Sequence, residues 1–422
     1  VPGMASRHGL QHMTATRVGL VHVMTVPQTF VLLTGQATFM QQQGFALTAV
    51  ASDGPYAPVF AAQEGVEVVP VDMPRRITPL ADLRALRQLV AVLRARRPSI
   101  VHAHTPKGGL LGMLAAWIAL VPVRIYHVRG LPLETATGVT RLLLRISERV
   151  SCTLAHRVFC VSHSLRDRIV EMGLVASEKV LVPHAGSGNG VDAAGAYNPD
   201  RMDHNTRDTC RREWGVPLDA PLVAFVGRIG REKGIVELVE AWALVRLAVP
   251  TAHLVLAGPV DNARDSLPTR VMDALRNDPR VHLLGHLKDA RAVYATADLV
   301  AHPSHREGFP NVPLEAAAMG RPVVTTLATG CRDAVMDGVT GALVHVGDVQ
   351  ALAAALQRYL ASPELREEHG AAGRARALRE YEPQRIWASY LAEYHRLLSM
   401  RGLSAPVAIP AVQPSVFNDM IA

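Results

Sequence analysis

Two glutamates, Glu307 and Glu315, lie in one Gly- and Pro-rich segment that follows a short apolar run. The pattern predicts a strand, then a loop that carries Glu307, then a helix that has Pro313 in its first turn and carries Glu315. Free N–H groups at the start of such a helix bind anions or hydroxyl oxygens, and the carboxylates can accept hydrogen bonds from sugar and ribose hydroxyls. The alternative is a structural role, in which Glu307 caps the helix and Glu315 lies on a solvated face.

A second segment, residues 223–234, predicts a strand, a turn and a helix start that carry Arg228, Arg231 and Lys233. A guanidinium fork and an ammonium point charge suit a diphosphate, so Arg228 and Lys233 are candidate phosphate ligands. A charged surface loop is the alternative. The segment lacks the Walker spacing GxxxxGK[ST], and the glycines of 186–190 do not follow GxGxxG, so an NAD enzyme is not supported.

Polar side chains also end two strands predicted in the first half of the chain. His102 and His104 alternate along one strand and His127 and Arg129 along the next, so each pair shares a face. A metal site needs more ligands, and no acidic partner is near in sequence. Structural or substrate-contact roles are favoured. Upstream, a loop with Gly35 enters a helix and offers N–H groups to a second ligand group.

The segment 75–97 holds seven arginines and a single acidic residue, Asp82, with apolar residues at helical spacing. It predicts a basic amphipathic helix. Such a helix either sits on an anionic bilayer or packs its apolar side on the core and leaves a solvated basic side.

The elements that position these residues alternate between short aliphatic runs and helical patterns, which is typical of parallel α/β sheets. Strands are predicted over 18–26, 46–51, 100–103 and 123–128 in the first half, and over 222–226, 253–257, 281–284, 299–302, 322–325 and 342–345 in the second. Residues 183–199 form the predicted linker between two domains. Helices are predicted over 349–360, 365–380 and 383–400. Ligands bind at the carboxyl ends of the strands in such sheets.

Composition limits the class of protein. A chain of 422 residues with 49% hydrophobic and 19% charged residues is globular and long enough for two domains. Its net charge of +7 predicts an anionic partner, but no nucleic-acid-binding motif stands out. Four scattered cysteines indicate a reducing, cytoplasmic compartment. The apolar run 18–26 predicts a buried strand. The apolar run 109–123 is too short to span a bilayer.

Six stretches agree in order and spacing with one known family and extend from about residue 18 to 394. They are 22–27 with 35–36, 102–109, 186–192, 226–228 with 233–234, 307–315, and 330–341. Together they resemble family 4 of the retaining glycosyltransferases, most closely its branch that builds capsule, O-antigen and exopolysaccharide repeat units.

The resemblance implies an α/β GT-B fold, with two Rossmann-like domains facing across a cleft and a C-terminal helix crossing back to the first. The implied parts are an acceptor-binding domain over 14–190, a sugar-nucleotide-binding domain over 191–382 and the crossing helix over 383–400. Residues 401–422 have no amphipathic period and are predicted to be a disordered tail.

The resemblance also implies roles for the candidate residues. Arg228 and Lys233 would hold the donor diphosphate, Glu307 the transferred sugar and Glu315 the ribose. The supporting groups would be Gly35, the backbone of Gly308, Phe309, Pro310, Asn311 and Val312, the loop 285–289 beside the base, and a sugar or acceptor pocket with His104, His127 and Arg129. Arg129 is a departure, because relatives commonly have His at that position.

The implied activity is transfer of a hexose or N-acetylhexosamine from a nucleotide sugar, expected to be UDP-linked, to a lipid-linked saccharide at the cytoplasmic face of the membrane. Front-face displacement with retention would let the leaving phosphate take the acceptor's proton. No metal or other cofactor is expected, because cations and a helix N-terminus stabilise the leaving diphosphate. The alternatives are a sugar-nucleotide epimerase of similar fold and a non-catalytic nucleotide-sugar-binding protein.

Overall fold

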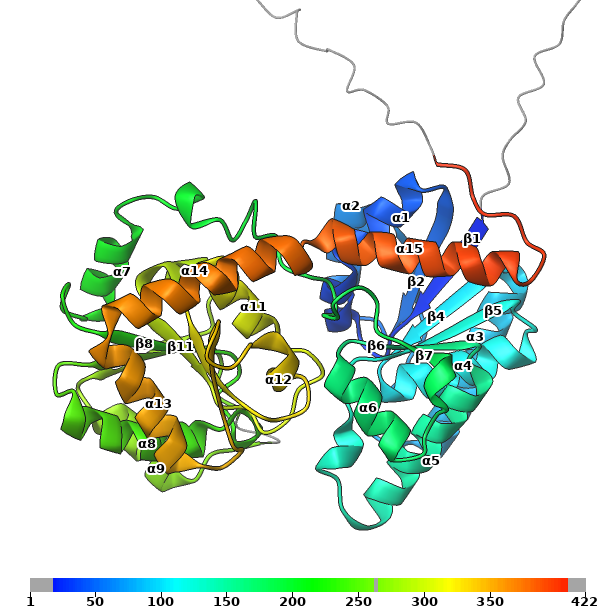
Figure 1. Ribbon diagram of the computed structural model, residues 1–422. Helices are drawn as coiled ribbons and strands as arrows, with labels where there is room; N and C mark the ends of the chain where they lie inside the picture. Colours follow the sequence, from blue (N-terminus) through cyan, green and yellow to red (C-terminus); the bar gives the residue numbers. More distant parts are fainter. Residues whose placement is uncertain (1–17, 262–264, 409–422) are drawn as a thin grey trace, which may run out of the picture.

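The computed structural model describes residues 18–261 and 265–408 and contains two parallel sheets in two lobes (Figure 1). Most of the predicted tail, residues 409–422, lies outside the described residues. No helix within the described residues is both long and apolar enough to cross a bilayer.

The first sheet has the order β3-β2-β1-β4-β5-β6-β7, and its paired strands are parallel. The strands are β1 (Val18–Val23), β2 (Phe45–Ala51), β3 (Glu67–Pro70), β4 (Ile100–His104), β5 (Val123–Val128), β6 (Arg157–Cys160) and β7 (Val180–Leu181). Helices cover both faces, which is why the central strands are mostly apolar and buried, with histidines toward their carboxyl ends. The register places His22 beside His102, and His104 beside His127, at the carboxyl edge.

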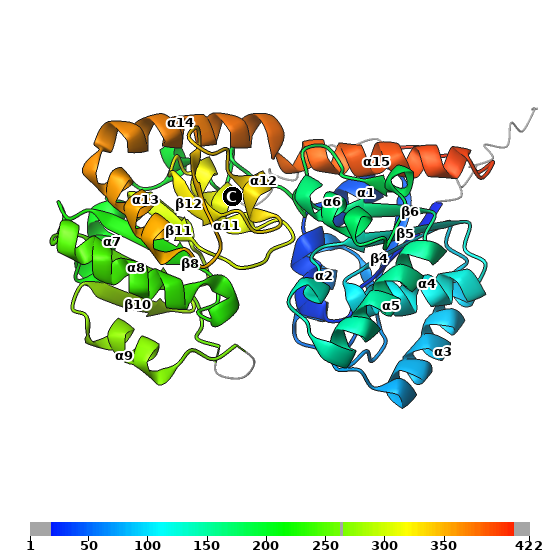
Figure 2. The same cartoon turned by 60° about the horizontal axis from the view of Figure 1, so that its bottom comes forward.

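The helical segments of the first lobe connect these strands. They are η1 (Pro27–Leu33), α1 (Gln36–Gln42), α2 (Tyr56–Glu64), α3 (Pro79–Arg96), α4 (Pro106–Ile118), η2 (Pro132–Glu134), α5 (Gly138–Leu154), α6 (His163–Glu171) and η3 (Ser177–Lys179). Helices α3, α4 and α5 lie side by side over one face of the sheet (Figure 2).

The second sheet has the order β10-β9-β8-β11-β12-β13. Its strands are β8 (Leu222–Val226), β9 (His253–Ala257), β10 (Val281–Gly285), β11 (Leu299–His302), β12 (Val323–Thr326) and β13 (Gly341–Val344). Its helical segments are η4 (Pro199–Arg201), α7 (Thr206–Trp214), η5 (Arg231–Lys233), α8 (Ile235–Ala248), α9 (Thr269–Asn277), α10 (Arg291–Thr296), α11 (Asn311–Ala318), α12 (Cys331–Ala334), α13 (Val349–Ala361) and α14 (Pro363–Glu380).

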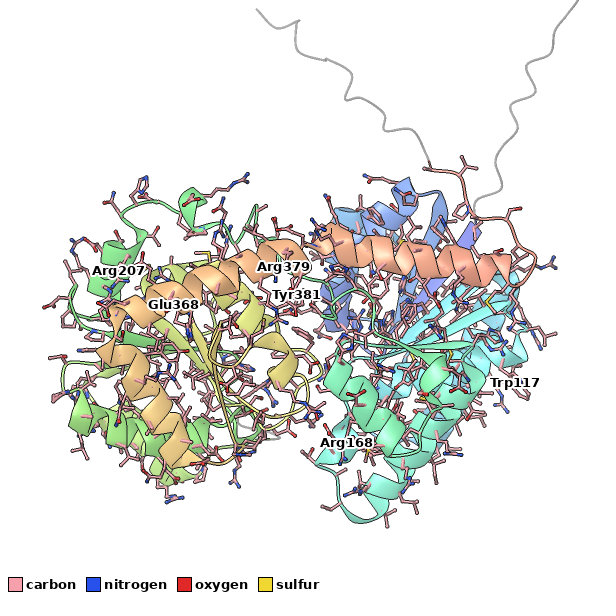
Figure 3. All side chains as sticks on the ribbon, in the orientation of Figure 1. Trp117, Arg168, Arg207, Glu368, Arg379 and Tyr381 are labelled. Atoms are coloured by element: carbon pink, nitrogen blue, oxygen red, sulfur yellow. The ribbon has the colours of Figure 1, made fainter. Side chains whose placement is uncertain are left out.

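The last helix, α15 (Pro383–Ser399), returns to the first lobe. Pro383 starts it after a break at Tyr381, which lies where the two lobes meet (Figure 3). Ile386, Tyr390 and Tyr394 are buried with residues of β2 and β5 in one of the two cores of the first lobe. The predicted crossing helix is therefore present, and it ties the chain's C-terminal end to its N-terminal sheet.

Helix α3 carries most of the arginine-rich segment. Its apolar residues Ala85, Leu89 and Leu93 are buried in a core of the first lobe, whereas Arg84, Arg87 and Arg94 are exposed. This part of the amphipathic pattern reflects packing on the sheet, as the second interpretation expects. Leu80 and Leu83 remain 85% and 44% exposed on the same helix, and contact of α3 with a membrane stays a prediction.

Candidate functional site

Glu307 lies in the loop between β11 and α11, as predicted, and its carboxylate is held by three side chains. Oε1 forms an ion pair with Lys233 Nζ, accepts a hydrogen bond from Ser304 Oγ at 2.9 Å, and lies 3.2 Å from His302 Nε2. Burial alone would raise the pKa of Glu307, but the hydrogen bond to His302 and the charge of Lys233 hold it well below its usual value. The carboxylate is thus charged, and the helix-capping alternative for Glu307 does not hold.

The Lys233 loop reaches Glu307 because two loops approach closely. Lys233 ends η5, and the next residue, Gly234, has a φ of 71°. A Cβ at Gly234 would lie 2.0 Å from the Pro303 carbonyl oxygen, so only glycine fits there. The loop after β8 and the loop after β11 are therefore pressed together at the carboxyl edge of the sheet.

Arg228, the second predicted phosphate ligand, lies in the same loop but has carboxylate partners of its own. Its guanidinium pairs with Asp261, and Glu232 lies 3.8 Å away. More than a third of the side chain is exposed, so a donor diphosphate can still reach it. Asp261, His302 and Ser304 were not predicted. The position of His302 at the end of a predicted strand is a sequence signal for a site residue, because ligands bind at the carboxyl ends of such strands.

Glu315 lies on α11, as predicted, but not on a solvated face. Its carboxylate accepts a 2.6 Å hydrogen bond from Tyr294 and a further one from Tyr197. Burial raises the pKa of Glu315, the two tyrosine hydrogen bonds oppose that shift, and the charge of Asp289 adds to it. Asp289 closes the loop 285–289, so the predicted base loop and the predicted ribose ligand do lie near each other.

The N-terminus of α11 lies between these two glutamates. No side chain caps it, so its first N–H groups have no intrahelical partner. Asn311 is exposed, whereas Phe309 and Pro310 are buried and Phe309 packs on Tyr381. The geometry offers an anion or hydroxyl site from the backbone near Asn311 and Val312.

The loop that carries Glu307 touches the first lobe at Gly308. Ser162 Oγ donates to the Gly308 carbonyl oxygen at 2.7 Å, and a Cβ at Gly308 would lie 1.9 Å from the Arg129 carbonyl oxygen. Thr329 donates to Glu134 at 2.9 Å in the same contact region. The carboxyl end of β5 therefore abuts the loop that carries Glu307.

Replacing Gly308 by alanine is expected to force these two segments apart, because the methyl group would overlap the Arg129 carbonyl. Activity should fall roughly 10- to 100-fold, in line with about 1–3 kcal/mol of overpacking. Small-angle scattering should show a wider separation of the lobes. Gly338→Ala is the control. Gly338 has a φ of 67°, and a Cβ added there would meet no other part of the described protein within 4 Å. Equal losses in both variants would contradict a clash with Arg129.

Four buried histidines gather at the carboxyl edge of the first sheet. His22 Nδ1 lies 2.9 Å from His104 Nε2, and His102 bridges Tyr394 of α15 at 2.6 Å and His127 at 3.2 Å. Burial, and then the charge of Arg129, lowers the pKa of His22 to about 3. Burial likewise keeps the pKa of the other three well below 6.5.

This cluster bears on the predictions for the first lobe. His22, His102 and His104 have ring nitrogens close enough to hold a metal ion. Arg129, however, donates to His104 at 3.1 Å and to the Gly188 carbonyl at 3.2 Å. A guanidinium in the cluster opposes a bound cation, which favours the structural or substrate-contact roles. Sequence alternation identified His102, His104 and His127 but not His22.

Gly35 is near the cleft but does not offer its N–H group. That group donates to Glu64 Oε1 at 2.8 Å, and a Cβ at Gly35 would lie 2.6 Å from the Trp387 ring. In the structure, Gly35 allows α1 to pack on α15. The predicted backbone cradle is therefore occupied within the protein at this position.

Two family models match the chain: glycosyl transferases group 1 over residues 206–376, and a glycosyl transferase 4-like domain over residues 31–186. The capsular polysaccharide biosynthesis glycosyltransferase CapM of Staphylococcus aureus is 31% identical over 379 residues, which are 90% of this chain and 97% of CapM. The UDP-Gal:alpha-D-GlcNAc-diphosphoundecaprenol alpha-1,3-galactosyltransferase of Escherichia coli is 25% identical over 288 residues, 67% of this chain and 72% of that protein.

Solved structures show the same architecture. Anabaena HepE in complex with UDP and glucose matches with a TM-score of 0.75 at 20% identity, covering 90% of this chain and all of HepE (100%). A glycosyltransferase from Rickettsia africae matches with a TM-score of 0.75 at 16% identity, covering 91% of this chain and 99% of its own. These likenesses confirm the predicted α/β GT-B fold.

Proposed function

The chain belongs to the group 1 glycosyltransferases with a glycosyl transferase 4-like first domain, and on that premise we propose which reaction it catalyses. It moves a hexosyl or N-acetylhexosaminyl group from a nucleotide sugar, UDP-linked, to a lipid-linked saccharide during surface polysaccharide biosynthesis. The anomeric configuration is retained. The likeness to CapM and to the diphosphoundecaprenol-dependent galactosyltransferase supports this acceptor class, and the comparisons give no support to an epimerase.

The ion pair between Lys233 and Glu307 carries the proposal. In the absence of donor the two charges neutralise each other beside the uncapped N-terminus of α11. A donor diphosphate would draw Lys233 and Arg228 toward its oxygens and leave the Glu307 carboxylate for the sugar hydroxyls. His302 and Ser304 keep that carboxylate in place, so Glu307 positions the sugar without acting as a general acid.

Charge stabilisation of the leaving group is the main chemical task. The C–O bond to the donor phosphate breaks as the acceptor oxygen forms its bond on the same face of the sugar, and the departing phosphate oxygen takes the acceptor's proton. Arg228, Lys233 and the α11 N–H groups stabilise the negative charge on the diphosphate. A metal ion has no required part in this scheme, so activity after EDTA treatment should equal that of the untreated protein.

In the first lobe, Arg129 stands where the family resemblance leads us to expect His. Its guanidinium bridges His104 and the linker carbonyl of Gly188, and its own carbonyl abuts Gly308. We assign Arg129 to the border between the sugar and the diphosphate. There its charge can add to that of Lys233, while His127 remains inside the histidine cluster.

The direct test is a screen of UDP-, GDP- and TDP-sugars with membrane extracts that contain lipid-linked saccharides. We expect radiolabel transfer from a UDP-sugar into the lipid fraction and an unchanged anomeric configuration by NMR. Conversion of the UDP-sugar without acceptor would indicate an epimerase. Binding with neither transfer nor hydrolysis would indicate a non-catalytic protein.

Glu315→Gln is expected to weaken donor binding with little change in kcat, because a neutral amide replaces a charged acceptor of the ribose hydroxyls. Hydrogen bonds to charged groups contribute about 1.5–3 kcal/mol, so KM for the donor should rise roughly 10- to 100-fold. The raised pKa of Glu315 also predicts that KM rises as the pH falls through it, since the protonated acid accepts less well. Tyr294→Phe is the control, because it removes only the 2.6 Å bond to Glu315. A drop in kcat alone would contradict the ribose role.

A further inference from the structure

A groove of about 700 Å³ runs over the first lobe, outside the donor site. Its side walls are aliphatic and come from the two neighbouring helices α4 and α5. The wall residues are Leu110 and Leu111 of α4 and Leu143, Leu144, Ile146 and Val150 of α5. A cavity of this size with an apolar lining is suited to a hydrocarbon chain.

One end of the groove is polar and lies at the cleft. Thr25, Arg75 and Thr105 line it, and they follow β1, β3 and β4 at the carboxyl edge of the sheet. Lys107 also lines this end and pairs with Asp82 at 2.7 Å. Arg75 is exposed and makes no ion pair with any residue that the structure describes, so its charge is available to an anion.

Helix α5 exposes a row of apolar side chains. Val139, Leu142, Leu143 and Ile146 are 73%, 57%, 43% and 51% exposed. The opposite side of the helix is fixed, because buried Glu148 accepts a 2.7 Å hydrogen bond from Tyr126. Four large apolar side chains exposed on one helix face form an apolar patch, and such patches usually mark a binding site.

The patch divides into two parts that can be tested separately. Leu143 and Ile146 are exposed and also line the groove, whereas Val139 and Leu142 are exposed but lie outside its lining. Arg141, Arg145 and Arg149 are exposed on the same helix. Positive charge therefore accompanies the apolar surface, and its complement is an apolar ligand that carries an anion.

We propose that the α4–α5 groove binds the hydrocarbon chain of the lipid-linked acceptor, with the acceptor's phosphate beside Arg75 at the cleft end. This inference rests on the proposed function, because it names the part of that acceptor which the groove recognises. The apolar walls of the groove supply affinity for the hydrocarbon chain. The polar end at the cleft fixes the direction in which the lipid lies, so the saccharide beyond the phosphate points toward Glu307. The occupant is a single isoprenoid or acyl chain, not the bilayer surface.

Farnesyl phosphate, below the concentration at which it forms micelles, is the probe. Calorimetric titration of the full chain should give saturable binding with a negative heat-capacity change, which marks burial of apolar surface. The double variant Leu143→Ser with Ile146→Ser should weaken binding at least roughly tenfold. The matched double variant Val139→Ser with Leu142→Ser should stay within about twofold of the parent.

All four side chains are exposed, so both double variants should keep their secondary structure and melting temperature, which circular dichroism checks. Equal weakening by the two pairs would overturn the groove and show a surface that faces the bilayer. Absence of saturable binding to the parent would also overturn it.

The direction of binding has its own test. Farnesol has the same chain without the phosphate, and the parent should prefer farnesyl phosphate. Arg75→Ala should remove most of that preference, and an unchanged preference would overturn the assigned phosphate position. None of these measurements uses a sugar nucleotide. If the proposed function fails, the donor screen shows no transfer by the parent, whereas failure of the groove leaves that transfer intact.

Discussion

Glu307→Gln is expected to lower kcat roughly 100- to 1,000-fold, the range seen when one preorganised group at a developing charge is removed. The amide keeps the shape of the side chain but carries no charge to pair with Lys233. The sugar and the diphosphate are then no longer held in a fixed position relative to each other. Lys233→Ala should give a loss of similar size, because it removes the ammonium that neutralises the leaving group. Initial rates with a UDP-sugar and a lipid-linked acceptor measure both effects.

The free energy of unfolding distinguishes a catalytic role of Lys233 and Glu307 from a role in folding. Lys233→Ala leaves the partly buried Glu307 carboxylate without its ammonium and should cost about 1–3 kcal/mol. Lys233→Met combined with Glu307→Gln removes both charges and should restore much of the stability. The activity of this double variant should nevertheless stay as low as that of either single variant, as expected for groups that act as a unit.

The control for the charge itself is Glu240→Gln, in the same domain. Glu240 of α8 pairs with Arg270 at 3.5 Å, and the two side chains are 46% and 75% exposed. Exposed pairs contribute at most about 1 kcal/mol, so this variant should match the parent. Parent-level transfer by both Glu307→Gln and Lys233→Ala would show that the donor site lies elsewhere.

How far the sequence predicts the fold depends on the length and burial of each element. Val123–Val128, Leu222–Val226 and His253–Ala257 are predicted to the residue, because each is a short, mostly apolar and buried run in the interior of a parallel sheet. β6 begins at a charged residue, Arg157, and β7 has two residues, so neither gives a periodic signal. Strands that short are recognised only when their neighbours are in place.

Amphipathic patterns show that a helix has an apolar face but not what covers it. The arginine-rich sequence of α3 suggests a membrane-facing helix, yet its residues Ala85, Leu89 and Leu93 pack on the sheet. The sequence of α5 gives no such sign, although Leu142 and Ile146 remain exposed. Which face meets the sheet is decided by contacts such as that of Glu148 with Tyr126, and these join residues on different elements.

The candidate site was predictable in its residue types but not in its pairings. Glu307 and Lys233 stand out because Gly and Pro place them in loops after strands. Their ion pair, and that of Arg228 with Asp261, depend on which strands are neighbours in the sheet. The order β9-β8-β11 brings those loops together, and sequence distance gives no sign of it.

Acidification is expected to unfold the first lobe before the second. The pKa of His22 is lowered to about 3 by burial, and burial also lowers the pKa values of His102, His104 and His127. The unfolded chain takes up protons on these residues below about pH 6.5, whereas the folded lobe does not. Stability is therefore complete above pH 6.5 and decreases as the pH falls toward the folded-state values.

The expected loss is large for a domain. His22, whose pKa in the folded lobe is about 3, costs about 1.4 kcal/mol per pH unit below 6.5 when it stays neutral, which is about 2 kcal/mol at pH 5. The other three histidines act in the same direction, and domains are stable by only about 5–15 kcal/mol, so the first lobe should open as the pH falls. Because α15 contributes Tyr394 to the cluster, the crossing helix should detach in the same transition.

Hydrogen exchange read by mass spectrometry resolves the two lobes, which a single melting curve would merge. Peptides from β4, β5 and α15 should lose protection at pH 5 after correction for the intrinsic exchange rate, and peptides from β8 and β11 should lose less. His127→Gln should reduce the stability difference between pH 7 and pH 5, whatever its effect at pH 7. His204→Gln, at an exposed loop position, should leave the difference unchanged. Equal protection of the first lobe at both pH values would show that the cluster can take up protons without opening.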